Sequence, residues 1–147
     1  KLGERYAMNM IADMNSGTEG WLDWNLCLDH KGGPNHAKNF CVAPLILNHE
    51  VPQLQPCYWF LLHFARFIRP GAQRVVCSSS RDVLEVTAWI NLGDRGAPGT
   101  TPDNVAVVVL NQSDQDIDFW LKVAGSGAVQ LMAPAHSIHT IIVEREP

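Results

Sequence analysis

The chain has 147 residues, which is enough for one domain with a substantial hydrophobic core. Its formal net charge of −4 argues against a nucleic-acid-binding surface, which is normally a basic patch. The sequence contains no apolar run long enough to cross a membrane. Four cysteines match no disulfide scaffold, so we interpret them as mostly buried thiols, and the sequence stays compatible with a secreted, periplasmic or cytoplasmic location. They are Cys27, Cys41, Cys57 and Cys77.

The chain opens with a helix signal and then a strand signal. Apolar residues at helical spacing predict a helix over residues 4–16. The alternating pattern of residues 20–26 predicts a short buried strand. A long connection over residues 27–55 follows, and loops of that length are uncommon unless they are functional.

Prolines mark the end of this first half. Pro44 restricts residues 41–47 to a brief edge strand, because proline cannot donate to a strand ladder. Pro56 occupies a favoured first helical position, and residues 57–67 are apolar nearly all round, which predicts a largely buried helix. A strand, a long loop and a helix in this order form one unit of a β/α barrel.

The second half has the pattern of an all-β module. After Gly71 the apolar period changes from that of a helix to that of a strand. Residues 105–110 form a continuous apolar run, as in a fully buried strand. Turns rich in Gly, Pro, Asp and Asn separate short strands, which predicts an antiparallel β-sandwich over residues 71–147, after a first part over residues 1–70. The strands are expected at 74–78, 84–90, 105–110, 117–123, 128–132 and 136–143.

Residues 20–40 combine groups suited to binding a polyhydroxylated ring. Trp24 offers a flat apolar face for the C–H side of a sugar and one N–H donor. Asp23 and Asn39 offer donors or acceptors to hydroxyl groups. Barrel enzymes place such groups where a strand ends and a long loop begins.

Two motifs here resemble the glucosylceramidase family of retaining glycoside hydrolases, family 30. The pattern GW-x-DWNL, followed by GGPN-x-x-x-NF, is similar to that family's last barrel strand and the loop after it. The stretch HFARFIRPGAQRV, from His63 to Val75, is similar to its final barrel helix and the exit into a β domain. The resemblance implies an α/β plus β fold: the last βα unit of a (β/α)8 TIM barrel, then a β-sandwich completed by strands from earlier in the protein.

The resemblance also implies roles for individual residues. Trp24 matches a tryptophan that lines the sugar subsite, Asn39 an asparagine that reaches a sugar hydroxyl, and Asp23 a supporting aspartate. Core packing is the alternative for Trp24, and loop capping for Asn39. Leu22 stands where a threonine is usual and His36 where some members have tryptophan, which leaves the aglycone preference open.

Retaining glycosidases use two carboxyl groups about 5–5.5 Å apart. The resemblance implies that both are glutamates upstream of Lys1, and neither motif occurs here; Glu4 and Glu19 are better interpreted as solvated surface charges. Because such a barrel takes about 250 residues, we expect the C-terminal portion of a longer β-glucosidase, inactive in isolation. Its expected partners are a glycoside or glycolipid substrate and the missing N-terminal barrel portion, with no cofactor.

Two other site types are weaker alternatives. Cys27, His30, His36 and Cys41 suggest a zinc site, but their spacings are looser than structural zinc sites prefer. Ser137 lies between two histidines, as in a hydrolase triad, but no Gly-x-Ser-x-Gly turn accompanies it.

A different class of function is a non-catalytic β module that binds carbohydrate or stabilises a partner. Trp89 and Trp120 lie on the polar faces of their predicted strands and would form its ligand platform. Covering a neighbouring barrel is the alternative role for both tryptophans.

Overall fold

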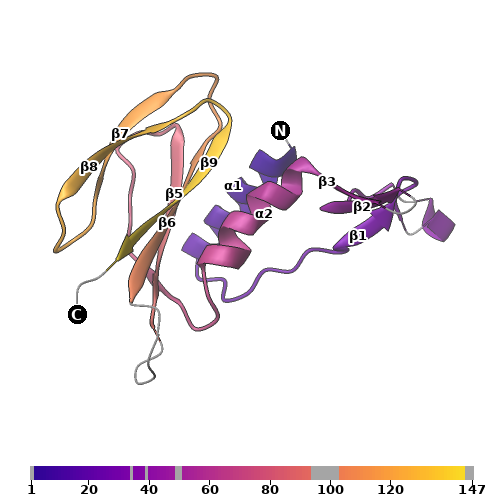
Figure 1. The fold of residues 1–147 in the computed structure, drawn as a ribbon, viewed down its shortest axis with the longest axis horizontal. Helices are drawn as coiled ribbons and strands as arrows, with labels where there is room; N and C mark the ends of the chain where they lie inside the picture. Colours follow the sequence, from indigo (N-terminus) through magenta and orange to yellow (C-terminus); the bar gives the residue numbers. More distant parts are fainter. Residues whose placement is uncertain (1, 34, 39, 49–50, 94–102, 145–147) are drawn as a thin grey trace.

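Two helices separate a β-sandwich from a small three-stranded sheet in a computed structural model of the chain (Figure 1). The structure describes residues 2–33, 35–38, 40–48, 51–93 and 103–144. Among these residues, no helix is long and apolar enough to span a bilayer.

The two predicted helices are confirmed, but the expected burial of the second is wrong: among its residues Cys57 and Phe64 are buried, while Trp59 is 52% exposed. Helix α1 spans Leu2–Asn15 and helix α2 spans Pro56–Phe67, with the proline in the first turn. They pack against each other along their length, and a Cβ added at Gly3 would overlap the ring of Phe60. Only glycine at this position lets the first turn of α1 approach α2 so closely.

The sandwich consists of two antiparallel sheets, as the alternating pattern predicts. The larger sheet has the order β4-β5-β6-β9 and the smaller pairs β7 with β8. Predicted and observed bounds agree to within one residue, except at β4, which ends three residues earlier than expected. The strands are β4 (Gln73–Val75), β5 (Leu84–Asn91), β6 (Asn104–Asn111), β7 (Ile117–Lys122), β8 (Ala128–Ala133) and β9 (Ser137–Glu144).

Strand β6 is buried on both faces, which explains its continuous apolar run. Val107 and Val109 point into the sandwich core, the cluster between the two sheets. Val108 and Leu110 point the other way, into the helix–sheet cluster formed with α1 and α2. The buried members of the helix–sheet cluster are Ala7, Met10, Ile11, Phe64, Val108 and Leu110.

A buried asparagine fixes the junction between α2 and the sandwich. The Asn91 side chain is 4% exposed, and its Nδ2 donates to the Phe67 carbonyl at 2.8 Å and to Asn104 Oδ1 at 2.9 Å. Its Oδ1 accepts the Arg69 backbone N–H at 2.9 Å. The end of α2 and the start of the next segment are therefore held to β5 by one amide.

The predicted buried strand over residues 20–26 is wrong. This segment has no strand pairing, and Leu22 and Leu26 are 96% and 68% exposed. A strand needs a neighbour to accept its ladder hydrogen bonds, and no strand within the described ranges lies beside this one. The alternating pattern is present, but its pairing partner is not.

The connection after it contains more structure than expected. Strands β1 (Cys27–Asp29), β2 (Leu45–Asn48) and β3 (Val51–Leu54) form a sheet in that order, with a short 3₁₀ turn at Asn35–Ala37. The expected edge strand over 41–47 is instead the central one, because β2 begins just after Pro44 and keeps all its donors. The two edge strands are β1 and β3, and β3 contains Pro52.

The cysteines are less buried than predicted. Only Cys57 is fully buried, while Cys27, Cys41 and Cys77 are partly exposed. Burial raises the pKa of the Cys57 and Cys77 thiols, so both stay protonated near neutral pH.

Truncating β6 on its helix-facing side tests this architecture. Leu110 is 0% exposed, so we expect Leu110→Ala to lower the free energy of unfolding by about 2–5 kcal/mol through lost burial and a residual cavity. Val76→Ala is the control, since Val76 is 94% exposed and its truncation should change stability by no more than about 0.5 kcal/mol. Denaturant unfolding of both variants provides the measurement; equal effects would contradict the double-sided burial.

Candidate functional site

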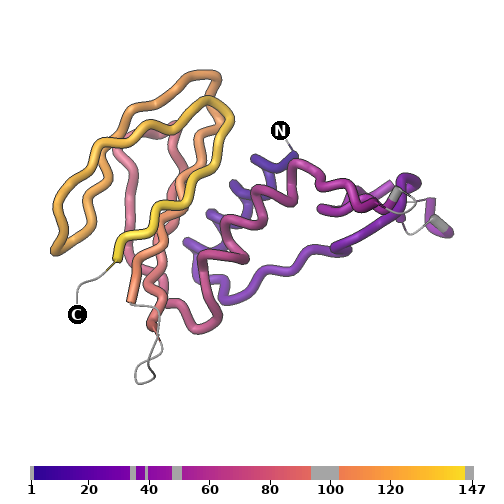
Figure 2. The backbone as a smooth tube through the Cα atoms, in the orientation of Figure 1, coloured from indigo at the N-terminus to yellow at the C-terminus, as the bar shows by residue number. Residues whose placement is uncertain are grey.

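The segment that carries the predicted sugar-binding residues runs back along α1. After the helix ends at Asn15, the chain turns at Gly17, whose φ is +101°, and continues toward β1 (Figure 2). Ser16 closes the helix by bonding to Ala12, through its backbone N–H at 3.0 Å and its hydroxyl at 2.8 Å. The reversal brings residues 21–24 beside the residues of α1.

Trp21 anchors this segment to the helix. Its Nε1 donates to Asp13 Oδ2 at 3.2 Å, and its ring meets the Tyr6 ring edge-on, with centroids 5.8 Å apart. An edge-to-face pair of this kind adds stabilisation beyond its buried area. Both partners lie on α1, one near each end, so the segment is fixed at two points along the helix.

Asp23 links α1 to the backbone of Trp24. Its Oδ1 accepts the Trp24 N–H at 2.8 Å and the Tyr6 hydroxyl at 3.4 Å. Burial raises the pKa of Tyr6, and the charge and hydrogen bond of Asp23 raise it further. The phenol therefore stays a donor across the physiological range. The predicted role of Asp23 as a supporting group in sugar binding stays a prediction.

The Trp24 ring itself is 71% exposed. It does not pack into either core cluster of the described chain, so the core-packing interpretation fails here. Phe40, at the far end of the following loop, is 81% exposed. Asn39 lies outside the described residues, so its predicted role stays a prediction.

The loop after β1 is held in a tight turn by its aspartate and glycine. Asp29 Oδ1 accepts the Lys31 N–H at 2.8 Å, and its carbonyl accepts the Gly32 N–H at 3.1 Å. Gly32 has φ +71°, and a Cβ there would lie 2.7 Å from the Cys41 carbonyl oxygen. The backbone at Gly32 thus closely approaches that of Cys41, which only glycine permits.

The alternative site types gain no support from the geometry. Within the described ranges, no three His, Cys, Asp or Glu side chains group closely enough to hold a metal ion. The Ser137 hydroxyl donates to the Pro134 carbonyl at 2.6 Å and lies 3.0 Å from His139 Nε2. Because the hydroxyl proton is already donated, His139 must be the donor in that contact, the reverse of what a nucleophilic serine requires.

Sequence reasoning was wrong about one carboxylate. Glu4 was expected to be a solvated surface charge but is 9% exposed, and its Oε1 lies 2.9 Å from His136 Nδ1. Glu19 is exposed, as predicted. Nothing in the local pattern separates the two, because the residue that covers Glu4 is 132 positions away in the chain.

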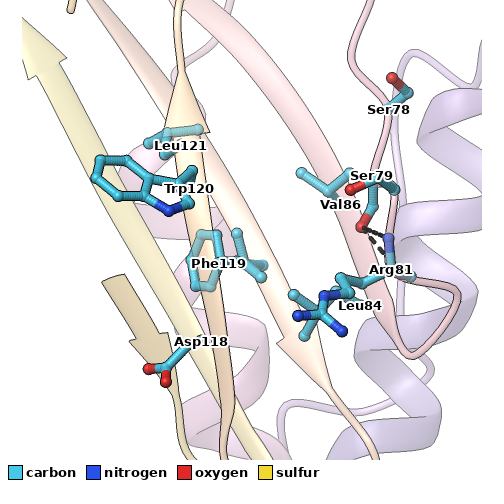
Figure 3. Close-up of a pocket in the computed structure, with 11 residues that line it drawn as sticks. Ser78, Ser79, Arg81, Leu84, Val86, Asp118, Phe119, Trp120 and Leu121 are labelled. Atoms are coloured by element: carbon cyan, nitrogen blue, oxygen red, sulfur yellow. Dashed lines mark hydrogen bonds between the residues drawn. The ribbon is translucent and has the colours of Figure 1, made fainter. Parts of the chain in front are cut away.

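The two tryptophans proposed as a sandwich ligand platform lie apart. Trp120 is 67% exposed and borders a cleft of about 460 Å³ between the sheets, with Arg81 and Asp118 (Figure 3). Trp89 instead lines a hollow with Met14, at the C-terminal end of α1, and donates to Thr87 Oγ1 at 3.0 Å. A single carbohydrate platform made by both rings is therefore not formed.

Comparison with known families identifies both parts of the chain. Residues 1–68 match the TIM-barrel domain of glycosyl hydrolase family 30, and residues 71–141 match the β-sandwich domain of the same family. The chain belongs to glycosyl hydrolase family 30. Its fold is the terminal part of a TIM barrel followed by a β-sandwich, as the two motifs implied.

Individual relatives agree with this assignment. The chain is 36% identical to mouse lysosomal acid glucosylceramidase and 33% identical to putative glucosylceramidase 3 of Caenorhabditis elegans, over 98% and 95% of its length. It spans 27% and 26% of those proteins. Among solved structures, SrfJ from Salmonella typhimurium is 29% identical with a TM-score of 0.85, covering 98% of this chain and 31% of that one.

A more distant neighbour shares the fold alone. The catalytic domain of the family 30 xylanase C from Talaromyces cellulolyticus is 18% identical, with a TM-score of 0.73 over 97% of this chain and 35% of that one. At this level of identity, the likeness shows that the two proteins share a fold, namely the barrel end and the sandwich. It does not indicate a shared substrate.

The contact between Tyr6 and Asp23 is directly testable. Because Asp23 raises the pKa of Tyr6 in addition to burial, Asp23→Asn should lower the titration midpoint of Tyr6. Ultraviolet absorbance of tyrosinate measures this in a Tyr58→Phe background, which leaves Tyr6 as the one tyrosine of the chain. Asp118→Asn, in the sandwich strand β7, is the control and should leave the midpoint in place. An unchanged midpoint in Asp23→Asn would disprove the contact.

Proposed function

We propose that this chain is the C-terminal part of a retaining β-glycosidase that hydrolyses β-glucosides, including glycosides of the glucosylceramide type. Membership of family 30 supports the glycoside hydrolase assignment. The names of the mouse and nematode relatives, both glucosylceramidases, support a glucoside as the substrate. The single observation that carries a sugar site in this chain is the exposed indole of Trp24, held at its backbone by Asp23.

In this proposal Trp24 stacks on the apolar face of a pyranose, Asn39 reaches one of its hydroxyls, and Asp23 supports the tryptophan. Tyr6 and Trp21 fix the same segment to α1, which restricts how far Trp24 can move. A rigid aromatic platform loses little conformational entropy on binding, and that favours affinity for a sugar ring.

Residues 1–70 form the end of the catalytic barrel and residues 71–147 the sandwich. The two family matches support this division, since the first ends at residue 68 and the second begins at residue 71. The Asn91 side-chain amide supports this division as well, because it bonds to Phe67 and Arg69, which lie just before the boundary at residue 70. The sandwich then braces the barrel through the helix–sheet cluster.

The first part presents an apolar surface that a larger barrel would cover. A contiguous soluble domain rarely leaves so many large apolar side chains exposed in one part of its sequence. The chain spans about a quarter of the length of its relatives, which is consistent with an additional barrel portion that supplies the two catalytic carboxyl groups. The exposed side chains are Leu22, Trp24, Leu26, Phe40, Val42, Leu47, Val51, Leu54 and Trp59.

The β-module alternative has one observation in its favour, the exposed Trp120 beside the cleft of the sandwich. It does not account for Trp89, which faces the end of α1, nor for the barrel half. Titration of the chain with oligosaccharides, followed by tryptophan fluorescence, distinguishes the two. A saturable change that Trp120→Ala abolishes would favour the module.

The stacking role of Trp24 is tested in the complete enzyme with an aryl β-glucoside. We expect Trp24→Ala to reduce kcat/KM by about 30-fold or more, the effect of losing an aromatic contact worth at least about 2 kcal/mol. Trp120→Ala is a matched control, because the two indoles are 71% and 67% exposed and the second lies in the sandwich. If both variants keep the parent kcat/KM, Trp24 is not a substrate contact. If the unaltered enzyme does not hydrolyse any β-glucoside, the function itself is wrong.

The purified 147-residue chain should have no glycosidase activity, because the resemblance assigns both catalytic glutamates to earlier barrel strands. Incubation with the same aryl β-glucoside and detection of the released aglycone is the measurement. Turnover that scales with the concentration of this chain, and that persists after repurification, would contradict the assignment of both catalytic glutamates to earlier barrel strands.

A further inference from the structure

One histidine of the sandwich lies between two carboxylates from separate elements. His136 Nδ1 is 2.9 Å from Glu4 Oε1, in the first turn of α1. Its Nε2 is 2.7 Å from Asp114 Oδ1, in the turn between β6 and β7. Both ring nitrogens therefore face an acceptor, and only the doubly protonated imidazolium can donate to both.

The backbone around His136 is held by hydrogen bonds that do not involve its side chain. Its N–H donates to the Ser113 carbonyl at 3.2 Å, and the preceding Ala135 N–H donates to Asp116 Oδ1 at 2.9 Å. His136 has φ +54°, a left-handed conformation that few residues other than Gly adopt, with Asn, Asp and His the most common of them. This conformation is held by the turn between β6 and β7 and directs the ring toward α1.

The partner on α1 is unusually enclosed for a carboxylate. The Glu4 side chain is 11% exposed, whereas the Asp114 side chain is 95% exposed. An enclosed carboxylate is costly unless a cation or donors compensate it. Glu4 also lies in the first turn of the helix, so the contact holds that end of α1 to the sandwich.

We propose that His136 is a pH-dependent latch between the barrel part and the sandwich, closed when its imidazolium bridges Glu4 and Asp114 and weakened when the ring loses a proton, because the neutral ring keeps one N–H and can donate to only one of the two carboxylates. The proposal rests on the geometry of the three side chains and is independent of the glycosidase assignment. It adds a reversible contact to the permanent apolar contact of the helix–sheet cluster.

The direction of the pH dependence follows from the contacts. Hydrogen bonds to Asp114 and to Glu4 raise the pKa of His136 above its ordinary value. A group whose pKa is raised on folding contributes stability that is fully present below its unfolded pKa and is lost as pH rises through the folded pKa. The latch is therefore closed in mildly acidic solution and weakens on the alkaline side of the ordinary histidine range.

The other titratable groups near this loop do not replace either partner. Asp116, in the same turn, accepts a backbone N–H and holds the loop. His139, on β9, pairs with the Ser137 hydroxyl at 3.0 Å. The charge that responds to pH between these elements is thus that of His136, with Glu4 and Asp114 as its counter-charges.

The decisive measurement is the titration midpoint of His136 in the full polypeptide that carries this chain. Nuclear magnetic resonance of ¹³C-labelled histidine rings reports it, and the His136 signal is assigned by its disappearance in His136→Asn. We expect a midpoint above about 6.5, the value of an unperturbed histidine. We also expect a downward shift in each of Glu4→Gln and Asp114→Asn. Glu19→Gln and Asp118→Asn remove the same charges at exposed positions and should leave the midpoint unchanged.

A second measurement asks whether the charge holds the helix. Hydrogen exchange at the amides of residues 6–8, which donate to the carbonyls of the first turn of α1, should rise several-fold between about pH 5.5 and pH 8.5 in the parent protein, after correction for intrinsic rates. In His136→Asn this pH dependence should be lost, because asparagine tolerates the left-handed backbone but carries no titrating charge. Far-ultraviolet circular dichroism verifies that the variant is folded.

Two results would overturn the latch. A His136 midpoint at or below the ordinary value, or one that neither carboxylate substitution lowers, would show that the ring does not hold a bridging proton. Equal pH dependence of exchange in the parent and in His136→Asn would show that protonation does not restrain α1. The midpoint itself is read in the parent protein, with His136→Asn used to assign the signal, so misfolding of a carboxylate variant cannot mask a value at or below the ordinary one.

Discussion

The burial of β6 on both faces is the constraint on which the rest of the molecule depends. One face of the strand carries Val107 and Val109 into the sandwich core, and the other carries Val108 and Leu110 against the helices. Neither half of the chain alone can bury both apolar faces of this strand. The helices and the second sheet therefore pack on opposite faces of this strand, and each half covers surface that the other would leave in water.

Hydrogen bonds between polar groups set the position of the helices on the sandwich, which apolar burial alone does not determine. The Asn91 amide holds the end of α2 to β5, and His136 holds the start of α1 to the sandwich through Glu4. Hydrogen bonds have direction, whereas apolar burial does not. The helices are consequently fixed at opposite ends, and the segment that carries Trp24 inherits its position from α1 through Tyr6.

The errors in the sequence-based prediction share one cause. The alternation over residues 20–26 predicted a strand, but pairing requires a second strand at the right distance, and period alone does not supply one. Pro44 predicted an edge position, yet the strand begins after the proline and becomes central. Glu4 was expected at the surface because its burial depends on His136, at the opposite end of the sequence. Each error concerns a pairing or a burial that the pattern within one segment does not encode.

The sequence by itself determined both helices, the sandwich strands, the double burial of β6 and the family, because periodicity and short motifs are local properties of the chain. It also identified Trp24 and Asp23 as candidates. Only the tertiary structure decided that Tyr6 orients Asp23, that Trp24 is exposed, and that Trp89 and Trp120 face different hollows. These facts depend on which distant segments meet in space, and that is settled by packing and directional hydrogen bonds rather than by any pattern within one segment.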